Sequence, residues 1–356
     1  MERETAISRL RTEIMSGTGP DVFILASGDL IPYPEEAMEN GLFLPLDTYM
    51  ENSSRFTNWD DQQQTVLAAG RNEEGQQIIP LSYTFPVTVY PQTALDVDKP
   101  DTLLTWNDTL TDPEWKDIYA SINDLREESL TIDFDGVPRW YIGSTPDLEY
   151  VVGRIADYKE EELLVTEEEL LQRIKEVLAL REESPITHEL GTAPYREKYM
   201  SQDISNKVYN APITILPMYS DDGGVTVTVN NYAAINRNTR QPEKAYTVID
   251  ILMRESMQLH TSFFANGVCN VGWGAIPLNN NALHPDHPFY FYYLDEASFE
   301  ELTDIKEQIT AVNFDTPLIT DLAGLFHECV DAHEANQPID EIVHEEYVQI
   351  QRKLRE

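Results

Sequence analysis

The spacing of apolar residues predicts that the chain begins with a helix followed by a strand. Apolar side chains recur at the interval of one helical face over 3–15, and Gly17 then favours a helix end. The next apolar run, DVFILA over 21–26, is short and bounded by turn residues, which predicts a buried strand in a parallel sheet. With a short helix expected over 35–40, this order indicates an α/β fold.

Two capping-box patterns predict where later helices begin. Thr166 and Glu169 lie three residues apart ahead of a strongly periodic segment, 167–180, and Ser298 and Glu301 repeat the arrangement. The predicted buried face of the first of these helices consists of Leu170, Leu171, Ile174, Val177 and Leu178. Further helices are predicted from Pro242 onward, over 320–335 and over 338–354.

Two extended segments predict strands that cross between parts of the molecule. Segment 76–95 holds three prolines, which exclude a helix. Segment 223–238 is rich in β-branched residues and is interrupted by polar ones, which favours a second crossing strand. Between the two segments, Asp135-Gly136 with apolar flanks predicts a tight hairpin turn.

The size and charge of the chain narrow the classes of partner. Its 356 residues, of which 41% are hydrophobic, are enough for two domains of average size. The formal net charge of −38 repels phosphate backbones and anionic lipid surfaces, which argues against a nucleic-acid partner. No apolar run reaches the roughly 18 residues that span a bilayer. The charged opening MERETAISRLRTEIM lacks the apolar core of a signal peptide and, taken alone, indicates a cytoplasmic protein.

Sequence motifs for catalysis are missing. The glycine-rich phosphate and dinucleotide loops, the zinc-protease motif and the nucleophile elbow do not occur. Cys269 and Cys329 match no metal or redox spacing and are interpreted as structural thiols, and His284 and His287 as solvated loop histidines. With 63 acidic residues, paired carboxylates can be drawn almost anywhere and carry no information. We therefore predict no catalytic residue, no cofactor and no metal.

Aromatic and amide side chains at predicted loops and strand interruptions indicate a binding site. Flat rings stack on the C–H faces of sugars, while amides donate to and accept from hydroxyl groups. Core packing and turn chemistry explain the same residues equally well one by one, so both interpretations stay open. The residues are Trp140, Tyr141, Asn230, Asn231, Tyr232 and Trp273.

Three segments in this order resemble a known family. They are LRTEIMSGTGPDVF over 10–23, NNYAAINRNTRQPEKAYTVIDILM over 230–253 and GWGAIPLNNNAL over 272–283. Together they resemble the extracellular solute-binding proteins of ABC importers, family 1, the type that binds maltose and oligosaccharides. The resemblance runs from Arg9 to the C-terminus, and its order and spacing make it specific.

The resemblance implies a two-lobed α/β fold of the periplasmic-binding-protein type, class II. Its lobes are discontinuous, 1–85 plus 226–300 and 86–225 plus 301–356, and they close around a ligand by hinge bending. Family members begin with a signal peptide and a strand ahead of the first helix. The resemblance therefore also implies that the first sheet lacks its N-terminal strand, that the chain is truncated, and that the full-length protein is a cell-surface lipoprotein or periplasmic.

The function implied by the resemblance is non-catalytic capture of an extracellular oligosaccharide. A monomer would deliver it to the membrane permease subunits of an ABC importer. Two alternatives stay open: a binder of polyamine, peptide or another polar solute on the same scaffold, and a carbohydrate-active enzyme with paired carboxylates. The ligand-binding residues implied by position are Ser27, Gly28, Asp29, Tyr83, Thr84, Trp140, Tyr141, Asn230, Asn231 and Trp273.

Overall fold

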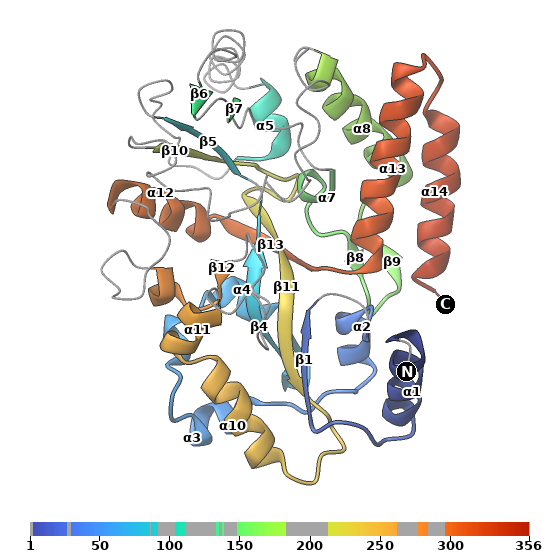
Figure 1. Ribbon diagram of the computed structural model, residues 1–356. Coiled ribbons are helices and arrows are strands. Elements are labelled where there is room, and N and C mark those ends of the chain that lie inside the picture. Colours follow the sequence, from blue (N-terminus) through green and yellow to red (C-terminus); the bar gives the residue numbers. More distant parts are fainter. Residues whose placement is uncertain are drawn as a thin grey trace.

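The computed structural model has a part built on a β-sheet and a part built mainly of helices (Figure 1). The helical part contains α8 (Glu167–Glu182), α13 (Pro317–Glu334) and α14 (Asp340–Lys353). The model describes residues 3–26, 30–85, 87–91, 104–111, 133–134, 137–138, 148–182, 213–261, 276–283 and 296–355. Among these residues, the helices are too short or too polar to cross a bilayer.

A five-stranded sheet organises the first part. Its strands follow the order β1 (Val22–Ala26), β11 (Val225–Ile235), β4 (Ile78–Thr84) and β12 (Ile276–Pro277), with β13 (Ile309–Phe314) paired to β11 outside this path. Strand β13 runs parallel to β11, whereas β1 and β4 run antiparallel to it. The prediction that 21–26 lies in a parallel sheet is therefore wrong, because an apolar run encodes burial but not the direction of its neighbour.

The first helix, α1 (Arg3–Met15), and the strand after it lie where the sequence predicts them. Strand β1 lies directly beside β11, and the expectation of a further N-terminal strand stays a prediction. The extended segment 76–95 contributes β4 and then β5 (Val87–Pro91), which leaves the first sheet to pair with β10 (Ile213–Pro217). The turn from β10 into β11 requires Gly224, whose φ is 80° and whose missing Cβ would collide with the Gln308 carbonyl.

Short strands and helices complete the described chain. The strands β6 (Asp133–Phe134) and β7 (Val137–Pro138) pair with Phe134 opposite Val137, which confirms the predicted hairpin although 135–136 lie outside the described residues. Two further pairs are β2 (Arg71–Asn72) with β3 (Gly75–Gln76), and β8 (Ala156–Asp157) with β9 (Glu162–Leu163). Further helices are α2 (Pro34–Glu39), α3 (Asp47–Ser53), α4 (Gln64–Ala68), α5 (Trp106–Thr111), α7 (Leu148–Val151), α10 (Pro242–Leu252), α11 (Glu255–Thr261) and α12 (Glu296–Glu307), with 3-10 turns at Trp59–Asp61 and Asn280–Leu283.

Buried apolar side chains form two clusters. The first core surrounds the five-stranded sheet and includes Phe23, Ile79 and Phe314. The second core joins α5, α7, α8, α13 and α14 through residues such as Trp106 and Ile174. Strand β13 follows residue 300 yet packs in the first core, so the two cores do not coincide with the predicted lobe boundaries, which remain a proposal.

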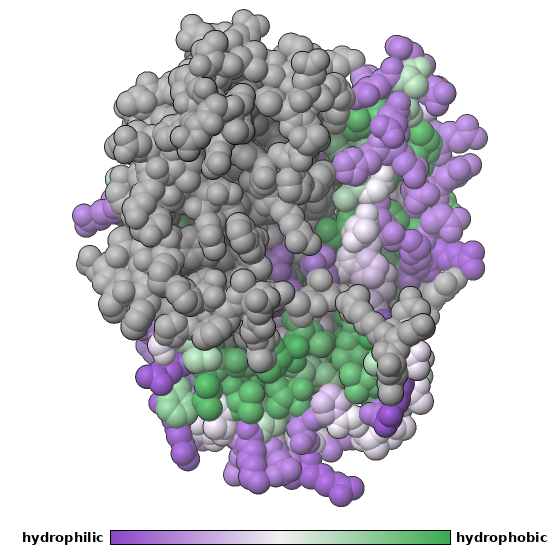
Figure 2. All heavy atoms as spheres, in the orientation of Figure 1, coloured by the Kyte–Doolittle hydropathy of each residue, from purple (hydrophilic) through white to green (hydrophobic). Residues whose placement is uncertain are grey.

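Cys329 lies in the second core, where burial raises the pKa of its thiol to about 12. A buried, protonated thiol fits the structural role expected for it. Cys269, His284 and His287 lie outside the described residues. Hydrophilic side chains dominate the visible surface of α13 and α14 (Figure 2), in keeping with an acidic, solvated exterior.

The capping box at the start of α8 is confirmed. The Thr166 hydroxyl lies 3.2 Å from the Glu169 backbone nitrogen, and the Thr166 backbone N–H donates to the Glu169 carboxylate at 2.9 Å. The second predicted capping box is wrong, because α12 begins at Glu296 and Ser298 therefore lies inside the helix. The Glu301 carboxylate instead accepts from the Ile215 backbone N–H at 2.7 Å, a partner that is distant in sequence.

Replacing Thr166 with alanine should lower the free energy of unfolding by about 1 kcal/mol, since the first turn of α8 loses its cap. Urea denaturation of the two proteins measures the difference. Thr247→Ala is the matched control, because Thr247 is exposed within α10 and its hydroxyl donates to the Glu243 carbonyl of the same helix. An equal loss in both variants would show that the cap contributes nothing of its own.

Candidate ligand-binding site

The long strand β11 changes partners where several predicted ligand-binding residues meet. Its residues 225–229 pair with β13, and 231–235 pair with β1. One row across the sheet joins Ala26, Asn231, Ser82 and Pro277. The predicted residues Ser27, Gly28 and Asp29 follow Ala26 in the chain but lie outside the described residues, as do Trp140, Tyr141 and Trp273.

The two predicted asparagines point to opposite faces of the sheet. Asn231 is buried and its side-chain amide donates to the Ser82 hydroxyl at 2.8 Å, so these two side chains share one face. Because side chains alternate along a strand, Tyr83, Asn230 and Tyr232 lie on the other face. We call these three residues the site face. Asn231 is engaged within the sheet, and its predicted contact with ligand stays a prediction.

The site face carries polar atoms that have no partner within the described part of the chain. Tyr83 is 0% and Tyr232 3% exposed. Among the described residues, neither phenol oxygen nor the Asn230 Oδ1 atom has a hydrogen-bond partner. Burial raises the pKa of both phenols, so each hydroxyl stays protonated and is able to donate and accept. Buried groups of this kind are costly unless protein, water or a ligand satisfies them.

Aromatic packing fixes the positions of the two phenols. The Tyr83 ring stacks on Phe85, two residues further along the chain, with centroids 6.3 Å apart. The Tyr232 ring meets Phe314 of β13 edge to face at 5.9 Å. Thr84, also predicted as a ligand residue, is buried at the end of β4, and the same alternation places it on the face of Ser82. Four of the predicted residues therefore come together on neighbouring strands, although their contact with ligand stays a prediction.

The polar face of β11 extends beyond the site face to the second core. Thr226 and Thr228 are buried on it, and the Thr226 hydroxyl has no partner among the described residues. Asn313 lies opposite Thr228, and its side chain binds the Gly153 carbonyl at 2.9 Å and the Ile155 N–H at 3.3 Å. The segment after α7 therefore covers one end of this polar face, and the site face lies beside the junction of the two cores.

The sequence signal that identifies this face is the alternation of apolar and polar residues with a period of two. In VTVTVNNYAAI over 225–235, valines alternate with polar residues as far as Asn230. The predicted strand interruption groups both asparagines with Tyr232, and Tyr232 is not among the predicted ligand residues. The alternation of side chains along the strand separates Asn231 from Asn230, and it makes Thr226 and Tyr232 candidate ligand residues.

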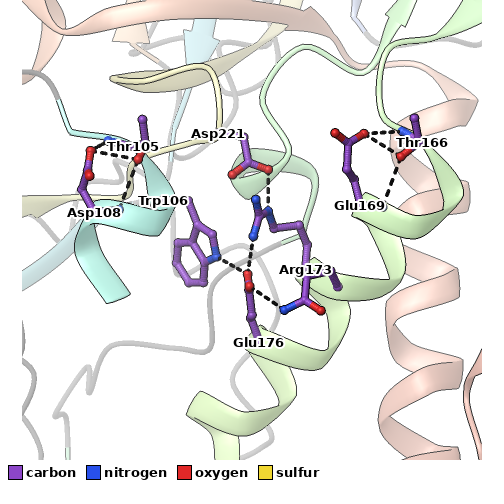
Figure 3. Close-up of polar contacts among 9 residues, drawn as sticks. Thr105, Trp106, Asp108, Thr166, Glu169, Arg173, Glu176 and Asp221 are labelled. Atoms are coloured by element: carbon purple, nitrogen blue, oxygen red, sulfur yellow. Dashed lines mark hydrogen bonds and ion pairs between the residues drawn. The ribbon is translucent and has the colours of Figure 1, made fainter. Parts of the chain in front are cut away.

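A second polar cluster tests the alternative of an enzyme with paired carboxylates. Arg173 of α8 binds Glu176 at 2.6 Å and Asp221 at 2.7 Å, and the Trp106 indole N–H donates to Glu176 at 3.0 Å (Figure 3). Burial raises the pKa of Asp221. For Glu176 burial acts in the same direction, but hydrogen bonds from Gln172, Arg173 and Trp106 outweigh it and lower the pKa.

A pair of acids with pKa values shifted apart is typical of general acid–base catalysis. Here, however, both carboxylates bind the same guanidinium, which lies between them in Figure 3. The cluster joins α8 to α5 and to the turn before β11, and it leaves no position between the acids for a glycosidic bond. Its arrangement favours a structural cross-link.

Comparison with solved structures identifies the fold. The chain is similar to the sugar-binding protein MalE from Xanthomonas citri, with a TM-score of 0.61 and 12% identity over 100% of this chain and 89% of that one. It is also similar to an extracellular solute-binding protein family 1 from Alicyclobacillus acidocaldarius (TM-score 0.56, 12% identity, 98% and 87% covered). A third is a periplasmic oligogalacturonide-binding protein from Yersinia enterocolitica (TM-score 0.56, 14% identity, 99% and 89% covered).

No protein-family model and no curated protein matches the sequence. Identities of 12–14% establish the fold alone, and they do so over nearly the whole chain. The expected periplasmic-binding-protein fold is therefore confirmed. The solved proteins of this fold named above are binding proteins by description.

Proposed function

We propose that this chain, which has the fold of periplasmic solute-binding proteins, captures a neutral polyhydroxylated solute such as an oligosaccharide and delivers it unchanged to an ABC importer. The observation that carries the proposal is the site face beside the junction of the two cores. There the side-chain oxygens of Tyr83, Asn230 and Tyr232 have no partner among the residues that the structure describes. The descriptions of similar structures as sugar-binding and oligogalacturonide-binding proteins support it.

The chemistry of the site face favours a ligand that brings hydrogen-bond donors. The Asn230 oxygen is only an acceptor, whereas each phenol hydroxyl is able to donate and accept. Sugar hydroxyls match this set, and aromatic rings offer faces for sugar C–H groups. Arg154, a cation at the junction of the two cores, is paired with Glu35 at 2.7 Å, so this guanidinium does not favour an anionic ligand. The loop residues Ser27, Gly28 and Asp29, with Trp140, Tyr141 and Trp273, would complete the site.

Replacing Tyr232 with phenylalanine should weaken binding of the cognate glycan roughly tenfold, since one hydrogen bond of about 1.4 kcal/mol is lost. The stability of the free protein should change little, because the phenol oxygen has no partner among the described residues. Isothermal titration calorimetry measures the affinity, after a thermal-shift panel of oligosaccharides, polyamines and peptides has identified the ligand.

Tyr347→Phe provides the matched control. The Tyr347 hydroxyl donates to the Val165 carbonyl at 3.0 Å, far from the site face, so this variant should lose stability and keep its affinity. A thermal shift only with polyamines or peptides would retain the scaffold and exclude the sugar. Chemical conversion of a bound glycan, detected by chromatography, would contradict non-catalytic capture and favour the enzyme.

A further inference from the structure

Arg154 lies where the second core meets the first. It is flanked in sequence by Val152 and Ile155 of the second core, while its guanidinium reaches two elements of the first part. The Nη1 atom donates to the Val312 carbonyl of β13 at 2.9 Å. The Nη2 atom donates to the carboxylate of Glu35 in α2 at 2.7 Å, and the Glu35 side chain is only 6% exposed. A single side chain therefore links segment 151–159 to both β13 and α2.

The contacts with β13 lie close to the points where the chain passes between the two cores. The Arg154 backbone N–H donates at 2.7 Å to Asp222, which lies in the turn that leads into β11. Asn313 holds the backbone on either side of Arg154, and α13 begins three residues after β13 ends. The short connections into β11 and from β13 to α13 therefore keep these segments close together.

The contacts with the α2 side have no such connection. Residues 33–39 and segment 151–159 lie far apart in the sequence, so no short stretch of chain joins them. Besides the Glu35–Arg154 pair, the Tyr33 and Tyr158 rings lie 6.0 Å apart, and Lys159 pairs with Glu73 at 2.8 Å in an exposed position. Rotation of the second core about the β13 side would break these contacts first.

A partly buried ion pair, with the Glu35 side chain 6% and the Arg154 side chain 38% exposed, suits a contact that opens and closes. Burial raises the pKa of Glu35, and the Arg154 guanidinium opposes this shift, so the carboxylate is held at a cost in desolvation. When the pair separates, both charges regain water, which offsets most of the lost attraction. An apolar contact of similar area would instead favour the closed arrangement throughout. The ion pair itself therefore adds only a small net preference for the closed arrangement.

We propose that the Glu35–Arg154 pair is a releasable latch that holds the second core against α2 and thereby closes the junction beside the site face. Tyr232 contacts Phe314 of β13, the strand whose Val312 carbonyl binds Arg154, so the latch lies one strand away from the site face. Release of the latch would open this junction, whichever solute the protein binds.

Spin-label distance measurements test the latch without a ligand. Labels are attached at N52C on α3 and E345C on α14, both exposed positions, in a background carrying C269S and C329A. The variants are E35Q, which keeps the size of the side chain, and R154K, which keeps the charge but cannot contact both partners. Each variant must first show a cooperative thermal transition.

We expect E35Q and R154K each to increase the population of longer distances several-fold over the background protein. E73Q is the matched control, because it breaks the exposed pair with Lys159 across the same boundary and should leave the distances unchanged. If E35Q does not fold, R154K alone decides the outcome. Distance distributions that superimpose on those of the background protein in every folded variant would overturn the latch, as would an equal effect of E73Q.

Discussion

Replacing Lys306 with methionine is expected to raise the free energy of unfolding by about 3 kcal/mol at pH 7. Lys306 lies in the last turn of α12 and is only 4% exposed, and among the described residues its ammonium group has no ion-pair or hydrogen-bond partner. Burial lowers its pKa from 10.5 to about 8. A difference of this size corresponds to about 3 kcal/mol of lost stability while the unfolded chain is protonated.

The pH dependence of this effect has a definite sign. Between pH 8 and 10.5 the unfolded chain binds more protons at this lysine than the folded protein, so the wild-type protein gains stability as the pH rises. The advantage of Lys306→Met should therefore be full at pH 7 and small at pH 10.5. Urea denaturation at the two pH values measures it.

Lys244→Met is the matched control, since Lys244 is exposed on α10 and should change stability by less than about 0.5 kcal/mol. A Lys306→Met protein that is less stable than wild type at pH 7 would contradict the prediction. It would mean that the ammonium group makes a favourable interaction in the folded protein that outweighs the cost of its burial.

Replacing Asp250 with alanine is expected to lower the free energy of unfolding by roughly 4 kcal/mol. Asp250 of α10 is 1% exposed, and its carboxylate accepts backbone N–H groups of three successive residues, Arg55 at 2.7 Å, Phe56 at 3.2 Å and Thr57 at 3.1 Å. Alanine would leave these donors without their acceptor, and each such loss costs about 1–3 kcal/mol. The loop after α3 would lose three of its hydrogen bonds to α10.

Urea denaturation of wild type, Asp250→Ala and Asp250→Asn measures the effect. The asparagine variant keeps one acceptor oxygen and should recover part of the loss. Asp304→Ala on the exposed face of α12 is the control and should cost less than about 0.5 kcal/mol. Equal stabilities of Asp250→Ala and wild type would show that water replaces the carboxylate at these N–H groups.

Local signals in the sequence determined most of the helices. The apolar period over 3–15 with Gly17 behind it gives α1, and the Thr166–Glu169 capping box gives the start of α8. Pro242 begins α10, as its fixed φ and missing N–H favour. These signals succeed because helix hydrogen bonds and caps join residues three or four positions apart. The interacting residues are therefore close together in the sequence.

The resemblance of three separated segments also predicted the solute-binding-protein fold, which comparison with solved structures confirms. It also grouped Tyr83 and Asn230, which share the site face, in one candidate site before the strands were paired. The direction of β1 in the sheet was not predicted correctly. Strand β1 pairs antiparallel with a strand about 200 residues further along, and nothing in DVFILA specifies that neighbour. The Ser298–Glu301 pattern failed for a related reason, since Glu301 binds Ile215 instead of capping its own helix.

The tertiary structure alone decided which polar side chains are buried and what they bind. Asn230 and Asn231 are identical in type and adjacent, yet Asn231 donates to Ser82. The Asn230 oxygen, on the opposite face, has no partner in the described part of the chain. Lys306 and Lys244 both lie on amphipathic helices, but only Lys306 is buried. The free energy of burying a polar residue depends on atoms from distant segments. Local sequence therefore determined the type and position of most helices and strands. Packing between distant segments determined the site face, the Glu35–Arg154 pair and the buried charges.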